Sequence, residues 1–122
     1  MPDYQLFGGV LRSAVAMPEL APAEGAIASW TLRQVDAAAM GGALEVLGRE
    51  DVDTGVEVAL CRVPDGLRLA FDDTGTFDIL DQGQRIDWAA PQAPDMEAVR
   101  KDILGRVLAV ALSMQTTMAL PR

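Results

Sequence analysis

Four short segments between Val56 and Trp88 alternate apolar with polar residues, and turn-forming residues separate each from the next. The segments are VEVALCRV, LRLAF, TFDIL and RIDW, and the turns are Pro64-Asp65-Gly66, Asp72 to Gly75 and Asp81 to Gln84. A period of two is typical of strands with one buried face. Connections this short join neighbouring antiparallel strands, so the region predicts a β-meander of about four strands.

The side chains of this meander divide between its two faces in a way that predicts a core. Leu67, Leu69 and Phe71 fall on one face of their strand, and Phe77 and Ile79 fall on one face of the next. We therefore expect Phe71 and Phe77 to point into the same core. In the first turn, we expect proline to fix φ and Gly66 to supply a positive φ.

The residues before the meander predict further, shorter strands. YQLFGGVLRSAVAMPEL alternates loosely and is broken at Gly8-Gly9, which indicates two short strands or one bulged strand. IASWTLRQV predicts a half-buried strand centred on Trp30 and Leu32. DAAAMGGALEVLG is interpreted as a loop that enters a short strand over 44–47.

After the linker AAPQAP, the chain predicts one long helix from about Asp95 to Gln115. Pro94 lies beside its start, and Asp95 and Glu97 lie in its first turn, where acidic residues are favourable. Its first half is amphipathic, but VLAVALSM is apolar nearly all round, so we expect cover on more than one side. The residues predicted to contact a partner there are Ile103, Leu104, Val107, Leu108, Val110, Leu112 and Met114.

Together these elements predict an α+β fold. We expect a single domain over residues 1–122, with a largely antiparallel, meandering β-sheet and one long C-terminal α-helix packed on it.

Charge and composition narrow the function classes. The chain has no histidine, which removes His-based triads and the common zinc sites. A net charge of −8 lacks the basic footprint of nucleic-acid binding, and no apolar window is long enough for a bilayer. We expect neither nucleic acid nor membrane as a partner. The single cysteine, Cys61, and the absence of a secretory signal predict a cytoplasmic protein.

The segment RLAFDDTGTFDIL resembles the site at which phosphorylating ATPases hold a nucleophilic aspartate. Such an enzyme also needs a lysine and further acids for Mg²⁺ from separate strand ends. Here the only lysine is Lys101, in the helix, and hairpin strands flank Asp72. We interpret the segment as a turn. No catalytic residue, cofactor or metal is predicted, and weak ion binding stays open for Asp51, Asp53, Asp72 and Asp73.

One family resemblance covers most of the chain. The opening pattern of Tyr4, Phe7, Gly8, Ser13 and Pro18-Glu19-Leu20 resembles the start of HPr-kinase-like serine kinase homologues. The segment DGLRLAF…GTFDILDQGQRIDW and the helix ILGRVLAVALSMQTTMALP are similar to the N-terminal domain of those proteins. The resemblance implies a domain that precedes a P-loop kinase domain. It carries no catalytic residue over to this chain, because the catalytic residues of the family lie in the kinase domain.

Three functions therefore stand as hypotheses. The leading one is a non-catalytic N-terminal binding or assembly domain, whose partner is a kinase-like domain, a precursor peptide or a second copy in a homo-oligomer. The second is a stand-alone peptide-recognition protein in peptide tailoring, which adds a strand of its ligand to an exposed sheet edge. The third is a small Mg-dependent enzyme that uses aspartates.

Overall fold

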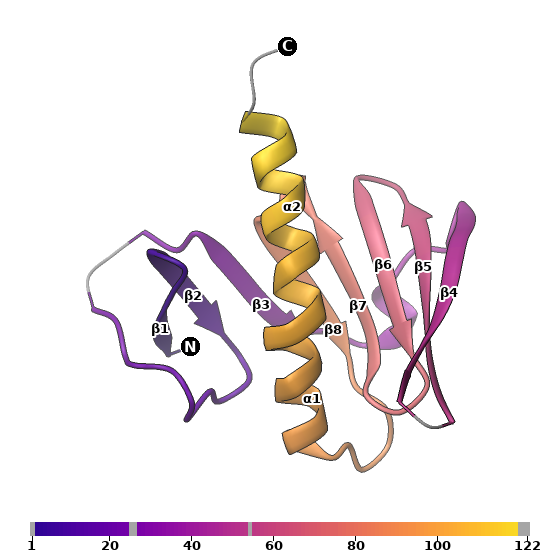
Figure 1. Ribbon diagram of the computed structural model, residues 1–122, viewed down its shortest axis with the longest axis horizontal. Coiled ribbons are helices and arrows are strands. Elements are labelled where there is room, and N and C mark those ends of the chain that lie inside the picture. The colour runs from indigo at the N-terminus through magenta and orange to yellow at the C-terminus, as the bar shows by residue number, and fades with distance from the viewer. Residues whose placement is uncertain (1, 25–26, 54, 120–122) are drawn as a thin grey trace.

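The computed structural model describes residues 2–24, 27–53 and 55–119, and in these it contains one eight-stranded sheet with a long helix across one face (Figure 1). The strands are β1 (Asp3–Leu6), β2 (Gly9–Ser13), β3 (Trp30–Gln34), β4 (Glu45–Asp53), β5 (Val56–Val63), β6 (Gly66–Phe71), β7 (Gly75–Leu80) and β8 (Arg85–Ala89). The helix consists of α1 (Met96–Asp102), a π-helical segment η3 (Ile103–Val107) and α2 (Leu108–Ala119). Two 3₁₀ turns, η1 (Ala37–Ala39) and η2 (Asp81–Gly83), complete the elements.

The strand order in the sheet is β1-β2-β3-β8-β7-β6-β5-β4. The strand β3 runs parallel to both of its neighbours, β2 and β8, and every other pair is antiparallel. The predicted α+β class, the largely antiparallel sheet and the C-terminal helix are confirmed. The sheet is open, so β1 and β4 are its two edges.

The predicted meander is present as β5 to β8, and its turns are as short as the sequence indicates. Phe71 and Phe77 meet edge to face with their ring centroids 5.8 Å apart, as expected for one shared core. The first turn differs in detail, because Asp65 takes the positive φ of 71°. Gly66 is needed for space instead, since a Cβ there would overlap the backbone carbonyl of Ile79.

The helix packs its amphipathic stripe on the middle of the sheet. Val99, Ile103 and Val107 are fully buried, and Phe77, Ile79, Ile86 and Trp88 lie in the same core. The predicted start is confirmed, because the Asp95 side chain accepts hydrogen bonds from the backbone N–H groups of Glu97 and Ala98. Figure 1 shows β6, β5 and β4 extending beyond the helix on one side, so that the inner face of these strands has less cover.

The strand β4 is longer than the sequence predicts. It was expected over 44–47, and it runs instead over nine residues, Glu45–Asp53. Its register against β5 shifts twice, between Val46 and Gly48 and between Asp51 and Asp53. Such bulges break the alternation of side chains, which is why the sequence shows no period of two here.

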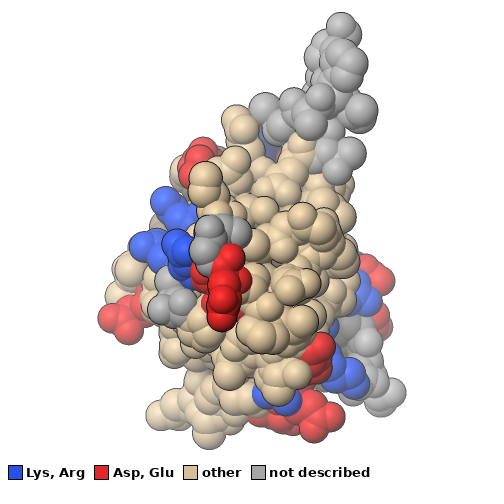
Figure 2. Space-filling view, turned by 90° about the vertical axis from the view of Figure 1, so that its left-hand side faces the viewer, with Lys and Arg blue, Asp and Glu red and all other residues tan. Residues whose placement is uncertain are grey.

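At the other end of the sheet, a loop of the chain covers the outer edge of β1. Gln5 donates its backbone N–H to the carbonyl of Ala21, and Ala23 donates its own to the carbonyl of Asp3, so 21–23 cover the outer edge of β1. Figure 2 looks onto this side of the molecule, where charged side chains of both signs lie in small groups and form no patch of one sign. Two ion pairs of the N-terminal segment are Arg12–Asp3, between β2 and β1, and Arg100–Glu19, which joins this segment to α1.

Candidate functional site

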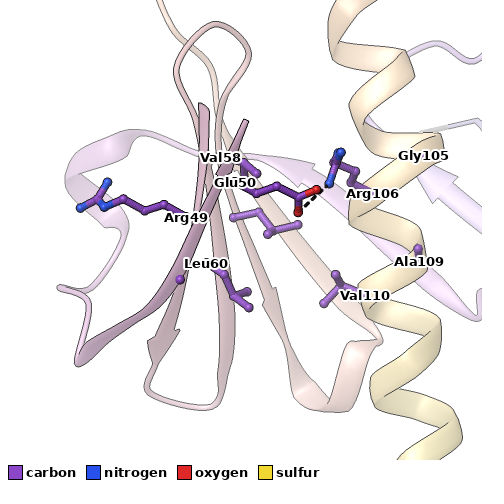
Figure 3. A pocket seen from close by; sticks show the side chains of 10 residues that line it. Arg49, Glu50, Val58, Leu60, Gly105, Arg106, Ala109 and Val110 are labelled. Atoms are coloured by element: carbon purple, nitrogen blue, oxygen red, sulfur yellow. Dashed lines mark hydrogen bonds and ion pairs between the residues drawn. The ribbon is translucent and has the colours of Figure 1, made fainter. Parts of the chain in front are cut away.

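A groove of about 410 Å³ lies between the helix and the inner face of β4, β5 and β6 (Figure 3). The sheet contributes Val58, Leu60 and Leu69, and the side chains of Leu60 and Val110 point into the space from opposite sides. The full lining is Gly48, Arg49, Glu50, Val58, Leu60, Leu69, Gly105, Arg106, Ala109 and Val110. The groove is apolar at its floor and charged at one end.

The groove is open because small residues stand on both of its walls. A Cβ added at Gly48 or at Gly105 would meet no atom within 4 Å, so both positions face unfilled space. Gly105 and Arg106 belong to the π-helical segment, and π-helical turns within α-helices frequently occur at functional sites. Here the π-helical turn presents a glycine, and not a bulky apolar side chain, to the groove.

One ion pair spans the groove. Arg106 Nη1 lies 3.4 Å from Glu50 Oε2, and the two side chains are 39% and 65% exposed. An exposed pair of this kind contributes little to stability, at most about 1 kcal/mol. Its importance is positional, since it places a carboxylate and a guanidinium at the end of an apolar surface. Figure 3 shows Arg49 pointing to the opposite side of the sheet.

The strand beside the groove, β4, is an exposed edge. Every side chain from Glu45 to Asp51 is exposed, and within the described residues β4 pairs with β5 alone. Three large apolar side chains near its start face solvent, with exposed fractions of 63% for Leu44, 51% for Val46 and 48% for Leu47. Charged residues protect sheet edges from pairing, and in β4 they follow at Arg49, Glu50 and Asp51. Glu45, the first residue of β4, is also charged, so Val46 and Leu47 form a short apolar stretch between charged residues.

The predicted partner-contact residues of the helix separate into two groups. Ile103, Val107 and Leu108 have no exposed surface and pack within the core of this chain, so they present nothing to a partner. Leu104, Val110 and Met114 are partly buried, and Leu112 is 38% exposed. Of the predicted set, Val110 also lines the groove.

The DDTGT segment forms the hairpin connection between β6 and β7. Asp72 Oδ2 accepts the backbone N–H of Glu57 at 3.0 Å, and Asp72 returns its own N–H to the Glu57 carbonyl. The interpretation as a turn is confirmed. Asp73 and Asp51 are exposed, and the Asp53 side chain lies outside the described residues. Within the part of the chain that the structure describes, no three His, Cys, Asp or Glu side chains group closely enough to hold a metal ion.

The outer face of the sheet carries a row of paired charges. Asp78 and Asp87 lie opposite each other in β7 and β8, and both are buried. Arg68 binds Asp78 through two nitrogens at 2.6 and 2.9 Å, and Arg33 binds Asp87 in the same way at 3.0 and 3.1 Å. The hydrogen bond to Asp78 raises the pKa of Arg68. Arg68 also donates to the carbonyl of Gly41, in the loop that leads into β4.

Another carboxylate, that of Asp102, lies where α1 meets the π-helical segment. Asp102 accepts a hydrogen bond of 2.6 Å from the hydroxyl of the buried Thr74. Burial raises the pKa of Asp102, and the Thr74 hydrogen bond opposes that shift. Thr74 is held in turn by the Trp88 indole, which donates to its carbonyl. This network fixes the end of α1 on the β6–β7 turn.

Sequence reasoning missed Gly48, Glu50, Gly105 and Arg106. The one available signal was Gly105, because a glycine inside a helix costs about 1 kcal/mol relative to alanine and usually has a local reason. Cys61, Trp30 and Trp88 are buried, as expected for core residues.

Within the described part of the chain, no helix has both the length and the apolar character needed to cross a bilayer. Comparisons of the chain with family models, with curated proteins and with solved structures give no match. The resemblance to HPr-kinase-like proteins therefore stays a prediction.

Proposed function

We propose that this domain is a non-catalytic binding module that holds an extended segment of a peptide or protein partner along β4, as an added strand. The observation that carries the proposal is the nine-residue edge strand, which is exposed over 45–51, includes the apolar Val46 and Leu47, and lies beside an apolar groove. In this mode of recognition, backbone hydrogen bonds supply affinity and side-chain pockets supply specificity.

The two edges of the sheet differ in a way that favours β4. The β1 edge is short, with four residues, and its backbone already bonds to 21–23. The β4 edge is more than twice as long, and its outer N–H and C=O groups face away from β5. A ligand strand at β4 would meet backbone donors and acceptors that pair with no other strand of the described residues, whereas one at β1 would have to displace 21–23.

The partner follows from the resemblance and is likewise a proposal. In an HPr-kinase-like protein, the added segment would be a substrate or precursor peptide held for a kinase-like domain. This role in peptide modification needs no catalytic residue in the present chain. The single cysteine, Cys61, supports a reducing compartment such as the cytoplasm.

Backbone methylation of a peptide tests strand addition directly. The probe is a fluorescent peptide of about nine residues, matched to the length of β4, with alternating leucine and threonine and a lysine at each end. Two derivatives carry N-methyl groups on all leucines or on all threonines. In a strand, alternate residues direct their N–H groups to opposite neighbours, so only one derivative loses its hydrogen bonds to β4.

We expect one derivative to bind at least about tenfold more weakly than the parent peptide and the other to bind nearly as well, in fluorescence anisotropy. Equal affinities of the two derivatives would contradict strand addition. So would the absence of parent binding at about 1 mM protein, where an affinity of about −4 kcal/mol is detectable.

Two matched variants locate the binding surface. Leu47→Lys changes an exposed leucine on β4, and Leu112→Lys changes an exposed leucine on the helix, with the same change in charge. We expect the first to weaken peptide binding and the second to leave it unchanged. The reverse result would identify the helix face as the contact surface.

A further inference from the structure

We infer that the segment held at β4 carries a large apolar side chain opposite Gly48 and a basic side chain two residues away, opposite Glu50. The inference rests on the proposed strand addition and names the class of ligand that it selects. Its basis is the position of Gly48 and Glu50 on one face of β4, at the mouth of the groove.

The register of β4 puts both positions on the groove side. Gly48 is paired with Leu60 and Glu50 with Val58, and the side chains of Leu60 and Val58 line the groove. Directly paired residues on neighbouring strands project to the same face of a sheet. A ligand residue opposite Gly48 therefore points its side chain toward the groove, and the ligand residue two places away does the same opposite Glu50.

Gly48 leaves the route from the edge strand into the groove unobstructed. It has no side chain, and the space where one would stand is empty to 4 Å. Behind it lie Leu60, Leu69 and Val110, which offer an apolar lining. Because the groove holds about 410 Å³, it can take a leucine, a methionine or a phenylalanine side chain of the ligand.

The charge of Glu50 favours a basic residue at the ligand position opposite it. The Glu50 side chain is 65% exposed, and its ion pair with Arg106 uses only part of the acceptor capacity of the carboxylate, which can accept from a second donor. Two other cations near the edge, Arg49 and Arg62, are already paired with Glu57 and Glu45. The whole chain carries a net charge of −8, which attracts a basic segment at longer range.

The same charges argue for a partner of different sequence over a second copy of this chain. Over 45–51, β4 carries the acids Glu45, Glu50 and Asp51 against one arginine, Arg49, so a second β4 would bring an excess of negative charge to an edge that is itself acidic. A basic segment neutralises these side chains. The occupant is therefore a basic, apolar peptide segment in extended conformation.

Side-chain changes in the peptide test this ligand class on the unmodified protein. The probe is a variant of the alternating peptide that keeps one central leucine and carries a lysine two residues from it. We expect replacement of that leucine by alanine to weaken binding about tenfold, and replacement of the lysine by glutamate to weaken it about fivefold. A lysine moved by one residue would project to the other face and lose its benefit.

Protein variants assign these effects to Gly48 and Glu50. Gly48→Val fills the groove mouth, so the preference for leucine over alanine should disappear, whereas Gly42→Val, also in open space, should preserve it. Glu50→Gln should abolish the preference for lysine over glutamate. Glu57→Gln, which alters an ion-paired acid of the neighbouring strand β5, should not.

The outcomes separate this inference from the function on which it rests. If the side-chain replacements leave the peptide affinity unchanged while the two N-methyl derivatives differ in affinity, the ligand class is wrong and strand addition still holds. If neither the side-chain replacements nor the choice of N-methyl derivative changes the affinity, both the ligand class and strand addition are wrong. A concentration-dependent dimer in sedimentation, dissociated by Leu47→Lys and unaffected by the peptide, would show that a second copy occupies β4 and would also overturn the inference.

Discussion

Replacement of Gly83 by alanine is expected to lower the free energy of unfolding by about 3 kcal/mol, because it forces the helix away from the sheet. Gly83 has a φ of 91°, which L-residues rarely adopt, and its added Cβ would overlap the backbone carbonyl oxygen of Ala111 on α2. The Gln115 Cγ atom lies 3.2 Å from the same Cβ position. Both obstacles belong to α2, so the helix has to move.

Urea denaturation, followed by the fluorescence of the buried Trp30 and Trp88, measures the effect. Gly42→Ala is the matched control, because that glycine is exposed and has no atom within 4 Å of the added Cβ. Its stability should stay within about 0.5 kcal/mol of the native chain. Equal stability of the two variants would show that α2 does not pack against Gly83 of η2.

Replacement of Arg68 by methionine is expected to cost about 3 kcal/mol of stability. Asp78 is only 5% exposed, and it would lose its counter-ion while still facing the carboxylate of Asp87 across the β7–β8 pair. A buried charge left without a partner is among the most destabilising changes in a folded protein. The loop before β4 would also lose the hydrogen bond from Arg68 to Gly41.

The double variant Arg68→Met/Asp78→Leu separates charge from packing. Because it removes both charges, it should recover most of the stability that the single variant loses. Arg62→Met is the control, since the Arg62–Glu45 pair is half exposed and should contribute less than about 1 kcal/mol. A double variant no more stable than Arg68→Met would mean that the guanidinium stem, and not its charge, supports this face.

The sequence was sufficient to predict the strands whose pairing partners are close in the chain. The turns at Pro64-Asp65 and Asp72–Thr74 join strands that pair only with their neighbours, so β5 to β8 follow from residues close in the chain. The place of β3 could not be predicted. It lies between β2 and β8, parallel to both, and its pairing with Arg85 to Trp88 joins segments more than fifty residues apart.

Most residues of the candidate site could not be predicted from the sequence, for a different reason. An apolar stretch such as VLAVALSM does not tell which side a sheet covers, and Val107 and Leu108 proved to be core residues. Two bulges removed the alternation that would have extended β4 past Leu47. Gly48 and Gly105 form the groove by lacking side chains, and a glycine in a sequence does not reveal whether its surroundings are empty.

The central claim is that β4 is the binding edge, and amide hydrogen exchange measured by NMR tests it most directly. On addition of the unmodified peptide to isotope-labelled protein, exchange should slow at the β4 amides that face away from β5 and stay unchanged in β1, whose outer edge 21–23 already cover. Unchanged exchange along β4 with the peptide bound, or slowing confined to β1 or to the helix around Leu112, would contradict the claim.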